Sequence, residues 1–204
     1  MNRKIRRMGW ALAALLWLSL PSPAIGEDWT VDPTHTMVNF KSRYVMISWV
    51  RGRFPTVKGE VFYVPGKPET AKAQILIDAA SIDTQHERRD THLKSPDFLE
   101  VEKHPTITFT SKRVQNVRKE GFELVGDLTI RGVTKEVVLK VEDLSQVTKD
   151  HRGRPRVAAS GAATINRHDF GVSWNRLLDA GGVMVGDEVH INIDLQLVKK
   201  GAAG

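Results

Sequence analysis

Residues 189–197 read Val-His-Ile-Asn-Ile-Asp-Leu-Gln-Leu, and apolar and polar side chains alternate through the whole segment. Successive side chains of a β-strand point to opposite faces, so this period of two predicts a strand with one buried and one solvated face. Shorter runs of the same kind surround Val38, Ile75, Ile107 and Leu139. The chain is therefore expected to be rich in strands.

Turn signals separate these runs, at Pro65-Gly66, Lys119–Gly121, Arg131-Gly132 and Arg152–Pro155. Because most of the runs follow one another without a helix between them, the pattern indicates an antiparallel barrel or sandwich. We favour a barrel of about eight strands, which closes on itself and leaves no exposed edge. We expect residues 27–204 to form this single domain, since no internal repeat or long linker divides them.

One segment breaks the strand pattern. Thr84-Gln85-His86-Glu87 has the spacing of a capping box, in which Thr84 accepts the backbone N–H of Glu87 and the Glu87 side chain reaches back. The residues that follow can continue as a helix for about two turns until Pro96 ends it. We expect a short helical insertion at about residues 84–100.

The alternation also predicts which side chains point into the barrel. The interior of a small barrel holds either packed side chains or one small ligand. Pattern alone favours packing, because most inward-facing apolar residues are core residues. The predicted inward residues, and hence the candidate ligand-binding residues, are Val38, Phe40, Ile75, Ile77, Ile107, Phe109, Leu139, Ile191, Ile193 and Leu195.

The first residues look like an export signal. A cationic start, Met1–Arg7, leads into an apolar stretch, Met8–Leu20, and Ala24 and Gly26 fit the small residues of a signal-peptidase site. The apolar stretch is shorter than the roughly 20 residues that a membrane-spanning helix needs. We therefore predict a cleaved signal peptide of residues 1–26 and a periplasmic, or secreted, mature protein.

Composition removes several classes of function. Four of the 30 basic residues lie within the first 26, which leaves 26 basic residues against 24 acidic ones, a net charge of +2. Nucleic-acid binding, which needs a concentrated basic surface, is not expected. The chain contains no cysteine, so disulfides, thiolate metal sites and cysteine nucleophiles are excluded.

Motifs for catalysis or metal binding are incomplete. The pair His86-Glu87 begins like a zinc-protease helix, but position 90 is aspartate, so the second histidine ligand is missing. Neither a Gly-x-Ser-x-Gly nucleophile elbow nor a glycine-rich phosphate loop occurs. We expect no metal and no cofactor.

Two charged clusters each leave two interpretations open. The first, with Arg89, Asp90 and His92, could hold an anionic head group near the barrel mouth, or could fasten the helix to the barrel. The second, Arg167–Gly171, could line an entrance or form a structural turn. The candidate head-group or entrance residues are Arg89, Asp90, His92, Arg167, Asp169 and Phe170.

Read in order, the motifs of the chain resemble those of the YceI-like family of exported polyisoprenoid-binding proteins. The similarity extends over nearly the whole of residues 27–204, and each motif is weak alone. The stretches that carry it are Trp29–Thr36, Val50–Phe54, Ser81–Thr84, Arg89–Phe98, His104–Ile107, Gly126–Thr134 and Ile165–Gly171.

This resemblance implies a lipocalin-like eight-stranded barrel whose apolar interior takes a long isoprenoid or related lipid, without a metal or an enzymatic step. It favours a cavity over a solid core, and transient membrane contact is a further partner hypothesis. One departure concerns ligand choice: Arg43-Tyr44 stand where many members have a histidine shortly after the first-strand phenylalanine.

Three hypotheses follow. The first is a periplasmic lipid-binding protein that carries, stores or sequesters a polyisoprenoid-type molecule. The second is a periplasmic hydrolase or isomerase acting on a lipid, with Asp90, His92 or His168 as acid–base groups. The third is a barrel with a solid core that contacts a protein partner through its surface.

Overall fold

The segment with the strictest alternation lies in β11 (Val185–Lys199), a strand that pairs along both of its edges. β10 (Pro155–Asn166) runs antiparallel along one edge from Arg156 to Asn166. The other edge is shared, because β2 (Met37–Tyr44) pairs with its first part and β1 (Glu27–Val31) with its last. The computed structural model describes residues 27–179 and 181–201.

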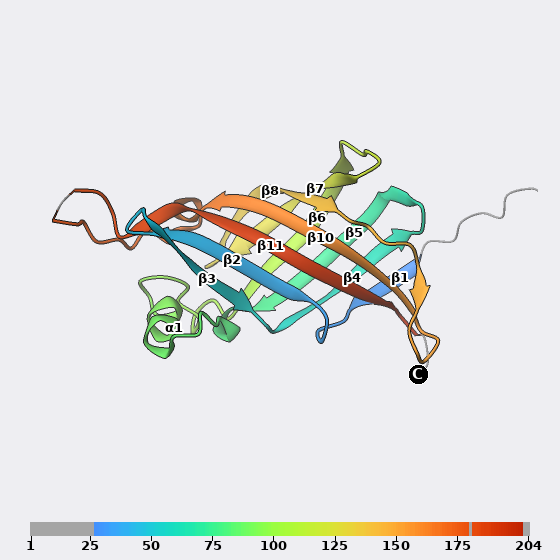
Figure 1. The fold of residues 1–204 in the computed structure, drawn as a ribbon, viewed down its shortest axis with the longest axis horizontal. Helices are drawn as coiled ribbons and strands as arrows, with labels where there is room; N and C mark the ends of the chain where they lie inside the picture. The colour runs from blue at the N-terminus through green and yellow to red at the C-terminus, as the bar shows by residue number, and fades with distance from the viewer. Residues whose placement is uncertain (1–26, 180, 202–204) are drawn as a thin grey trace, which may run out of the picture.

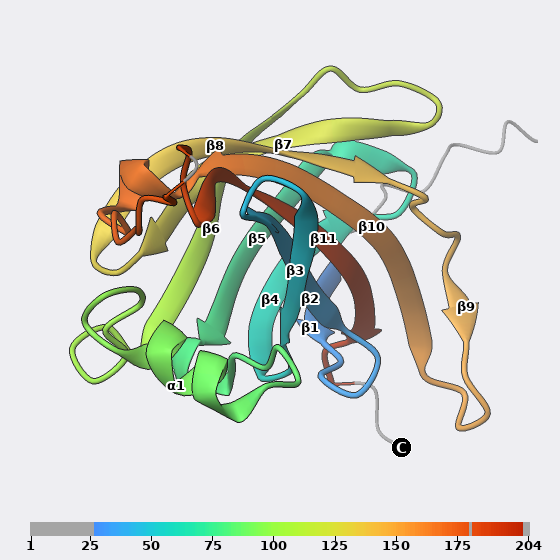
Figure 2. The same cartoon turned by 60° about the vertical axis from the view of Figure 1, so that its left-hand side comes forward.

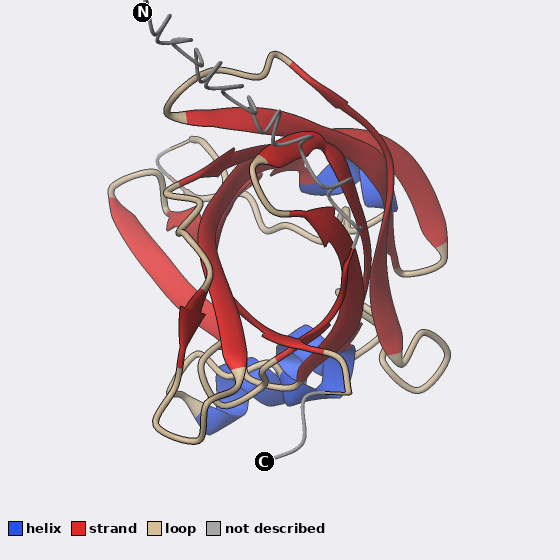
Figure 3. Ribbon diagram, turned by 90° about the vertical axis from the view of Figure 1, so that its right-hand side faces the viewer, coloured by secondary structure: helices blue, strands red, loops and turns tan. Residues whose placement is uncertain are grey.

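Eight antiparallel strands close into a barrel, in the order β1-β4-β5-β6-β7-β8-β10-β11 and back to β1 (Figures 1 and 2). Viewed from one side, the strands form a ring (Figure 3). The predicted all-β barrel is thus confirmed. The strands between β1 and β10 are β4 (Val57–Val64), β5 (Lys67–Asp78), β6 (Thr106–Gln115), β7 (Gly121–Ile130) and β8 (Val133–Glu142).

Three further strands extend this barrel. β2 and β3 (Ser48–Phe54) form a hairpin that joins the sheet through β11. The two-residue β9 (Thr148–Lys149) pairs with the start of β10. The four turns read from the sequence all fall between paired strands, at the β4–β5, β6–β7, β7–β8 and β9–β10 connections.

The helical insertion is shorter than expected and begins at a different cap. Within the described residues, the one α-helix is α1 (Glu87–Lys94), and His86 caps it by accepting the backbone N–H of Arg89. The predicted capping box at Thr84 is wrong. Thr84 is buried, and its hydroxyl is held by Asp90 and Arg89 instead. Two 3₁₀ turns, η1 (Ala79–Ser81) and η2 (Arg167–Phe170), follow β5 and β10.

The predicted signal peptide, residues 1–26, lies outside the described residues. Among those described, no helix combines the length and the apolar character needed to cross a membrane.

A charged cluster is buried where the loop after β1 meets the start of β10. Arg156 donates to Asp32 and to Asp150, the latter over 2.8 Å, and all three side chains are about nine-tenths covered. Burial raises the pKa of Asp32, but hydrogen bonds from Arg156 and His35 outweigh it, so this pKa lies well below its ordinary value. The hydrogen bond from Arg156 likewise lowers the pKa of Asp150. The cluster ties β10 to the segment after β1.

We predict that Arg156→Gln destabilises the fold in a pH-dependent way. Since the carboxylate pKa values are depressed in the folded state, their stabilising contribution is present above the unfolded pKa of about 4 and declines as the pH falls toward the folded values. Without Arg156, the expected loss in Tm is roughly 5–10 °C near neutral pH. The loss should shrink below about pH 4, where the unpaired carboxylates take up protons.

Thermal unfolding monitored by circular dichroism at both pH values measures this. Arg152→Gln, which removes an exposed charge from the same hairpin, should leave Tm unchanged. An equal loss for Arg156→Gln at neutral and acidic pH would show that packing, rather than charge pairing, accounts for the stability.

Candidate functional site

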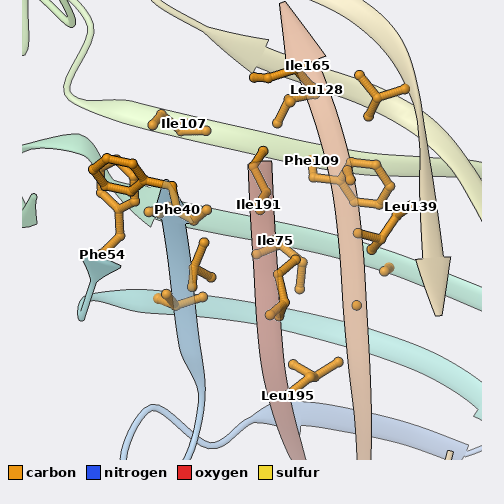
Figure 4. A pocket seen from close by; sticks show the side chains of 18 of the residues that line it. Phe40, Phe54, Ile75, Ile107, Phe109, Leu128, Leu139, Ile165, Ile191 and Leu195 are labelled. Atoms are coloured by element: carbon orange, nitrogen blue, oxygen red, sulfur yellow. The ribbon is translucent and has the colours of Figure 1, made fainter. Parts of the chain in front are cut away.

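A cavity of about 300 Å³ lies inside the barrel, and almost all of its wall is apolar (Figure 4). Side chains from β4 to β8, β10, β11 and the β2–β3 hairpin line it. This volume is at the lower end of the range of about 300–1,000 Å³ typical of small-molecule sites. A wall of hydrocarbon suits an apolar ligand, because burying each CH₂ contributes about 0.8 kcal/mol.

All ten inward residues named from the alternation lie in the cavity wall, and Figure 4 labels seven of them. Their part in ligand binding stays a prediction. Val38, Ile77 and Ile107 are buried, with less than a tenth of their surface exposed, whereas the other seven are only partly covered. Inward side chains that keep accessible surface belong to a barrel with a hollow interior, and the packed core favoured by the pattern alone is not what the structure has.

The room inside the barrel comes partly from β10, which sequence reasoning did not single out. Its inward positions near the middle are Ala159, Gly161 and Ala163. They stand opposite three large residues of β11, Leu195, Ile193 and Ile191. These small side chains lie beside the large ones on the inner face and extend little into the barrel, so they leave unfilled volume. The stretch Ala158–Ala163, AASGAA, could have indicated this strand. Its hydropathy alternates only weakly, but all six of its residues are small.

The strand β7 also went unnamed, although Phe122, Leu124, Leu128 and Ile130 line the cavity. Val125, between two inward positions, is apolar and fully buried although it does not line the cavity, so the alternation of apolar and polar residues is broken there. The mixed pattern hid the period of two.

Arg167 reaches the cavity wall, yet its guanidinium is committed to the backbone. Its side chain is 5% exposed, and it donates to the carbonyls of Gly186, Val172 and Trp174 over 2.7–3.0 Å. Burial lowers its pKa, and the charge of Asp187, 3.5 Å away, acts against this. The arginine therefore holds the segment after η2 to the start of β11, as a structural clamp.

The other candidate residues of the Arg167–Gly171 motif lie in different environments. Phe170 is buried in the cavity wall, whereas Asp169 lies on the surface. Gly171 takes a left-handed conformation, φ 71°, that ends η2. The structure thus forms a turn here, with two of the three candidate residues on its inner side.

Arg89 and Asp90 of α1 both bind Thr84. Arg89 donates to the Thr84 hydroxyl over 2.7 Å and to its carbonyl over 2.8 Å, while Asp90 accepts the hydroxyl and the backbone N–H of Thr84. The preceding Asp83 pairs with Arg53 of β3. These contacts fasten α1 beside the barrel. A head-group role for Arg89 and Asp90 stays a prediction.

His92 is not part of the cavity wall. It hydrogen-bonds with Asp97 over 2.8 Å and packs edge-on against Phe98 and Trp174. Phe98 lines the cavity, whereas His92 lines a separate groove, which is formed by side chains of α1 together with Tyr44 and Met184. The three rings therefore separate the apolar cavity from this groove. Tyr44 also lines the groove.

The acid–base candidates contact different partners at different places. His92 pairs with Asp97 and His168 pairs with Asp187, each over 2.8 Å, while Asp90 is held by Thr84. In the part of the chain that the structure describes, no three histidine, aspartate or glutamate side chains are grouped to hold a metal ion.

Comparison with known proteins places this geometry in a family. The family model described as the YceI-like domain matches residues 29–197. The chain belongs to the YceI-like family. A UPF0312 protein of Ectopseudomonas mendocina (strain ymp) is 36% identical over 167 residues, which cover 80% of this chain and 87% of the relative.

Solved structures share the barrel. Burkholderia cenocepacia BcnA superposes with a TM-score of 0.71 at 25% identity, covering 81% of this chain and 98% of its own. A Campylobacter jejuni YCEI protein gives a TM-score of 0.64 at 29% identity, with 78% and 90% covered. A polyisoprenoid binding domain from Saccharophagus degradans, 18% identical, gives 0.62 and covers 84% and 98%; at this identity the likeness concerns the fold.

Replacing the buried Arg167 by methionine should destabilise the segment between η2 and the start of β11. The change leaves buried backbone carbonyls of residues 172, 174 and 186 without donors, and each such loss costs about 1–3 kcal/mol. We expect the free energy of unfolding in urea to fall by roughly 2 kcal/mol or more. Amide exchange should accelerate in the same segment.

Arg176→Met is the matched control, because Arg176 is an exposed arginine of the same segment. It should leave the unfolding free energy unchanged. Similar values for both variants would show that the guanidinium of Arg167 is not a clamp.

Proposed function

We propose that the protein binds a long apolar chain of the polyisoprenoid type, or a similar amphiphile, within the barrel. The observation that carries this proposal is the cavity, whose wall is apolar and is built from strands that are far apart in sequence. Membership of the YceI-like family and the fold shared with a polyisoprenoid binding domain support it.

The polar groups around the cavity fit a binding role better than catalysis. Arg167, the charged residue in the wall, donates to backbone carbonyls, and the acid–base candidates lie outside the cavity wall and contact other protein groups. Binding would then rest on burial of the hydrocarbon tail, with the head group lying near an end of the barrel.

Location and biological role are parts of the same proposal. The expected signal peptide supports a periplasmic protein. In that aqueous compartment, a long apolar chain must be shielded from water. We therefore propose carrying, storing or sequestering such a lipid as the role of the cavity.

Gly161 offers a way to fill the cavity without introducing a charge. A Cβ at this position would lie 3.4–3.5 Å from Leu139 and Ile193, which is ordinary contact. Gly161→Ala should therefore be tolerated, whereas Gly161→Leu should place its isobutyl group in the ligand volume. We expect Gly161→Leu to bind a prenol at least about tenfold more weakly, at an equal or higher Tm, because new apolar contacts replace empty space.

Native mass spectrometry after incubation with geranylgeraniol in a mild detergent measures the retained ligand. Wild type and Gly161→Ala should keep the added mass, and Gly161→Leu should lose it. Undiminished retention by a folded Gly161→Leu variant would contradict binding inside the barrel.

The natural ligand is identified by organic extraction of the protein expressed with its full chain and purified from the periplasm. A prenyl mass is the expected result. A fatty-acid or phospholipid mass would keep the cavity as the site but correct the ligand class, and a bare polypeptide that takes up no prenol would overturn the proposal.

A further inference from the structure

Among residues 27–179 and 181–201, the most exposed large apolar side chains gather at one end of the barrel. Ile47 is 81% exposed, Leu177 is 80% exposed and Met46 is 54% exposed. Met46 and Ile47 form the turn between β2 and β3, and Leu177 belongs to the loop between η2 and β11, which projects at the same end (Figure 1). We name these three residues the apolar tip.

Backbone hydrogen bonds hold the two parts of the apolar tip together. The N–H of Val45 donates to the carbonyl of Met184 over 2.7 Å, and the N–H of Met184 donates to the carbonyl of Arg176 over 2.9 Å. Tyr44 pairs in register with Val185. The turn and the loop thus present their apolar side chains from one joined edge.

The turn residues are unusual for their conformation. Val45 and Met46 have φ values of 43° and 61°, a region that favours glycine and asparagine and disfavours β-branched side chains. Solvent exposure gives Met46 and Ile47 no compensating burial within the monomer. A partner that accepts apolar side chains would offset both the strain of the positive φ values and the exposure of Met46 and Ile47 to water.

A basic surface adjoins the apolar tip on the outer face of the β2–β3 hairpin. Lys41 and Arg51 are directly opposite each other across the two strands, a like-charge pairing that costs stability. Lys41 and Arg43 also lie over the ring of Trp49, 4.8 and 4.0 Å from its centroid. We call Lys41, Arg43, Trp49 and Arg51 the basic collar.

The cations of the collar keep their charge available. Among residues 27–179 and 181–201, no carboxylate lies within 4 Å of the charged groups of Lys41, Arg43 or Arg51. The neighbouring acids on β11 are Asp187 and Glu188, which face His168 and His190. A negatively charged partner would relieve the repulsion between Lys41 and Arg51.

We propose that this end of the barrel docks on an anionic lipid bilayer, with the apolar tip inserted among the acyl chains and the basic collar against the head groups. Protruding apolar side chains, a tryptophan and adjacent cations are the combination that suits the membrane interface. The docking rests on the proposed function for its purpose, since it would bring one end of the barrel that encloses the apolar cavity to the surface that holds such ligands.

Flotation with vesicles tests the proposal. Wild-type mature protein should bind vesicles of phosphatidylglycerol and phosphatidylcholine, and bind phosphatidylcholine alone much less. Lys41→Gln combined with Arg51→Gln should lower the partition coefficient about 30-fold, since each cation near an anionic surface contributes about fivefold, or ~1 kcal/mol. Ile47→Ser combined with Leu177→Ser should lower it about tenfold or more.

Matched controls lie at the opposite end of the barrel, where the register pairs of β10 and β11 begin at Arg156. Lys149→Gln with Arg152→Gln removes the same charge, and Val117→Ser with Val147→Ser removes exposed apolar side chains. Both controls should bind vesicles as wild type does. The proposal would be overturned if a control variant lost as much vesicle binding as the tip or collar variant that it matches. It would also be overturned if the wild type did not bind vesicles.

Retention of geranylgeraniol from detergent, measured on the same variants, separates docking from ligand binding. Loss of vesicle binding with unchanged prenol retention is the expected result for the tip and collar variants. Gly161→Leu should still float with anionic vesicles, because it leaves the apolar tip and the basic collar unchanged. Flotation therefore tests docking even if the ligand proposal fails. If the tip variants float normally but lose a protein that co-purifies with the wild type, the tip is a protein interface instead.

Discussion

The antiparallel pairing between β10 and β11 is the constraint on which the rest of the structure depends. It runs from Arg156 to Asn166 and closes the barrel. The same pairing sets Ala159, Gly161 and Ala163 opposite Leu195, Ile193 and Ile191, so closure brings a strand without bulk against a strand with bulk. The small inward side chains of β10 contribute little volume to the centre of the barrel, and this leaves room for the cavity.

Strand periodicity predicts well the parts of such a barrel whose inward side chains are large. It identified the inward face of β11 and the inner residues of β2, β5, β6 and β8, because an isoleucine next to an aspartate gives strong contrast. It missed β10, because alanine and glycine beside serine give little contrast, although they decide that the interior is hollow. The cap of α1 was missed for a different reason: Thr84 is taken by contacts with Asp90 and Arg89, and tertiary structure overrides the local capping preference.

Charged motifs were the least predictable part of the candidate site. Arg89, Asp90 and Arg167 are types of residue that often recognise an anion, and sequence alone left that role and a structural one open. In the folded protein Arg167 donates to backbone carbonyls and Arg89 donates to Thr84. Which role an arginine takes depends on whether its donors are already satisfied, and that depends on loop geometry several residues away. No pattern of spacing within a motif encodes it.

Under the proposed function, this distribution of polarity determines how a ligand is selected. A site that hydrogen-bonds a buried head group rejects analogues lacking it, because its own polar groups are then left unpaired. A wall of hydrocarbon carries no such penalty, and discriminates by the length and shape of the chain at about 0.8 kcal/mol per CH₂. The cations of the β2–β3 hairpin lie on its outer face rather than in the cavity wall. Affinity for the tail and attraction to an anionic surface are thereby separated, so each can change without altering the other.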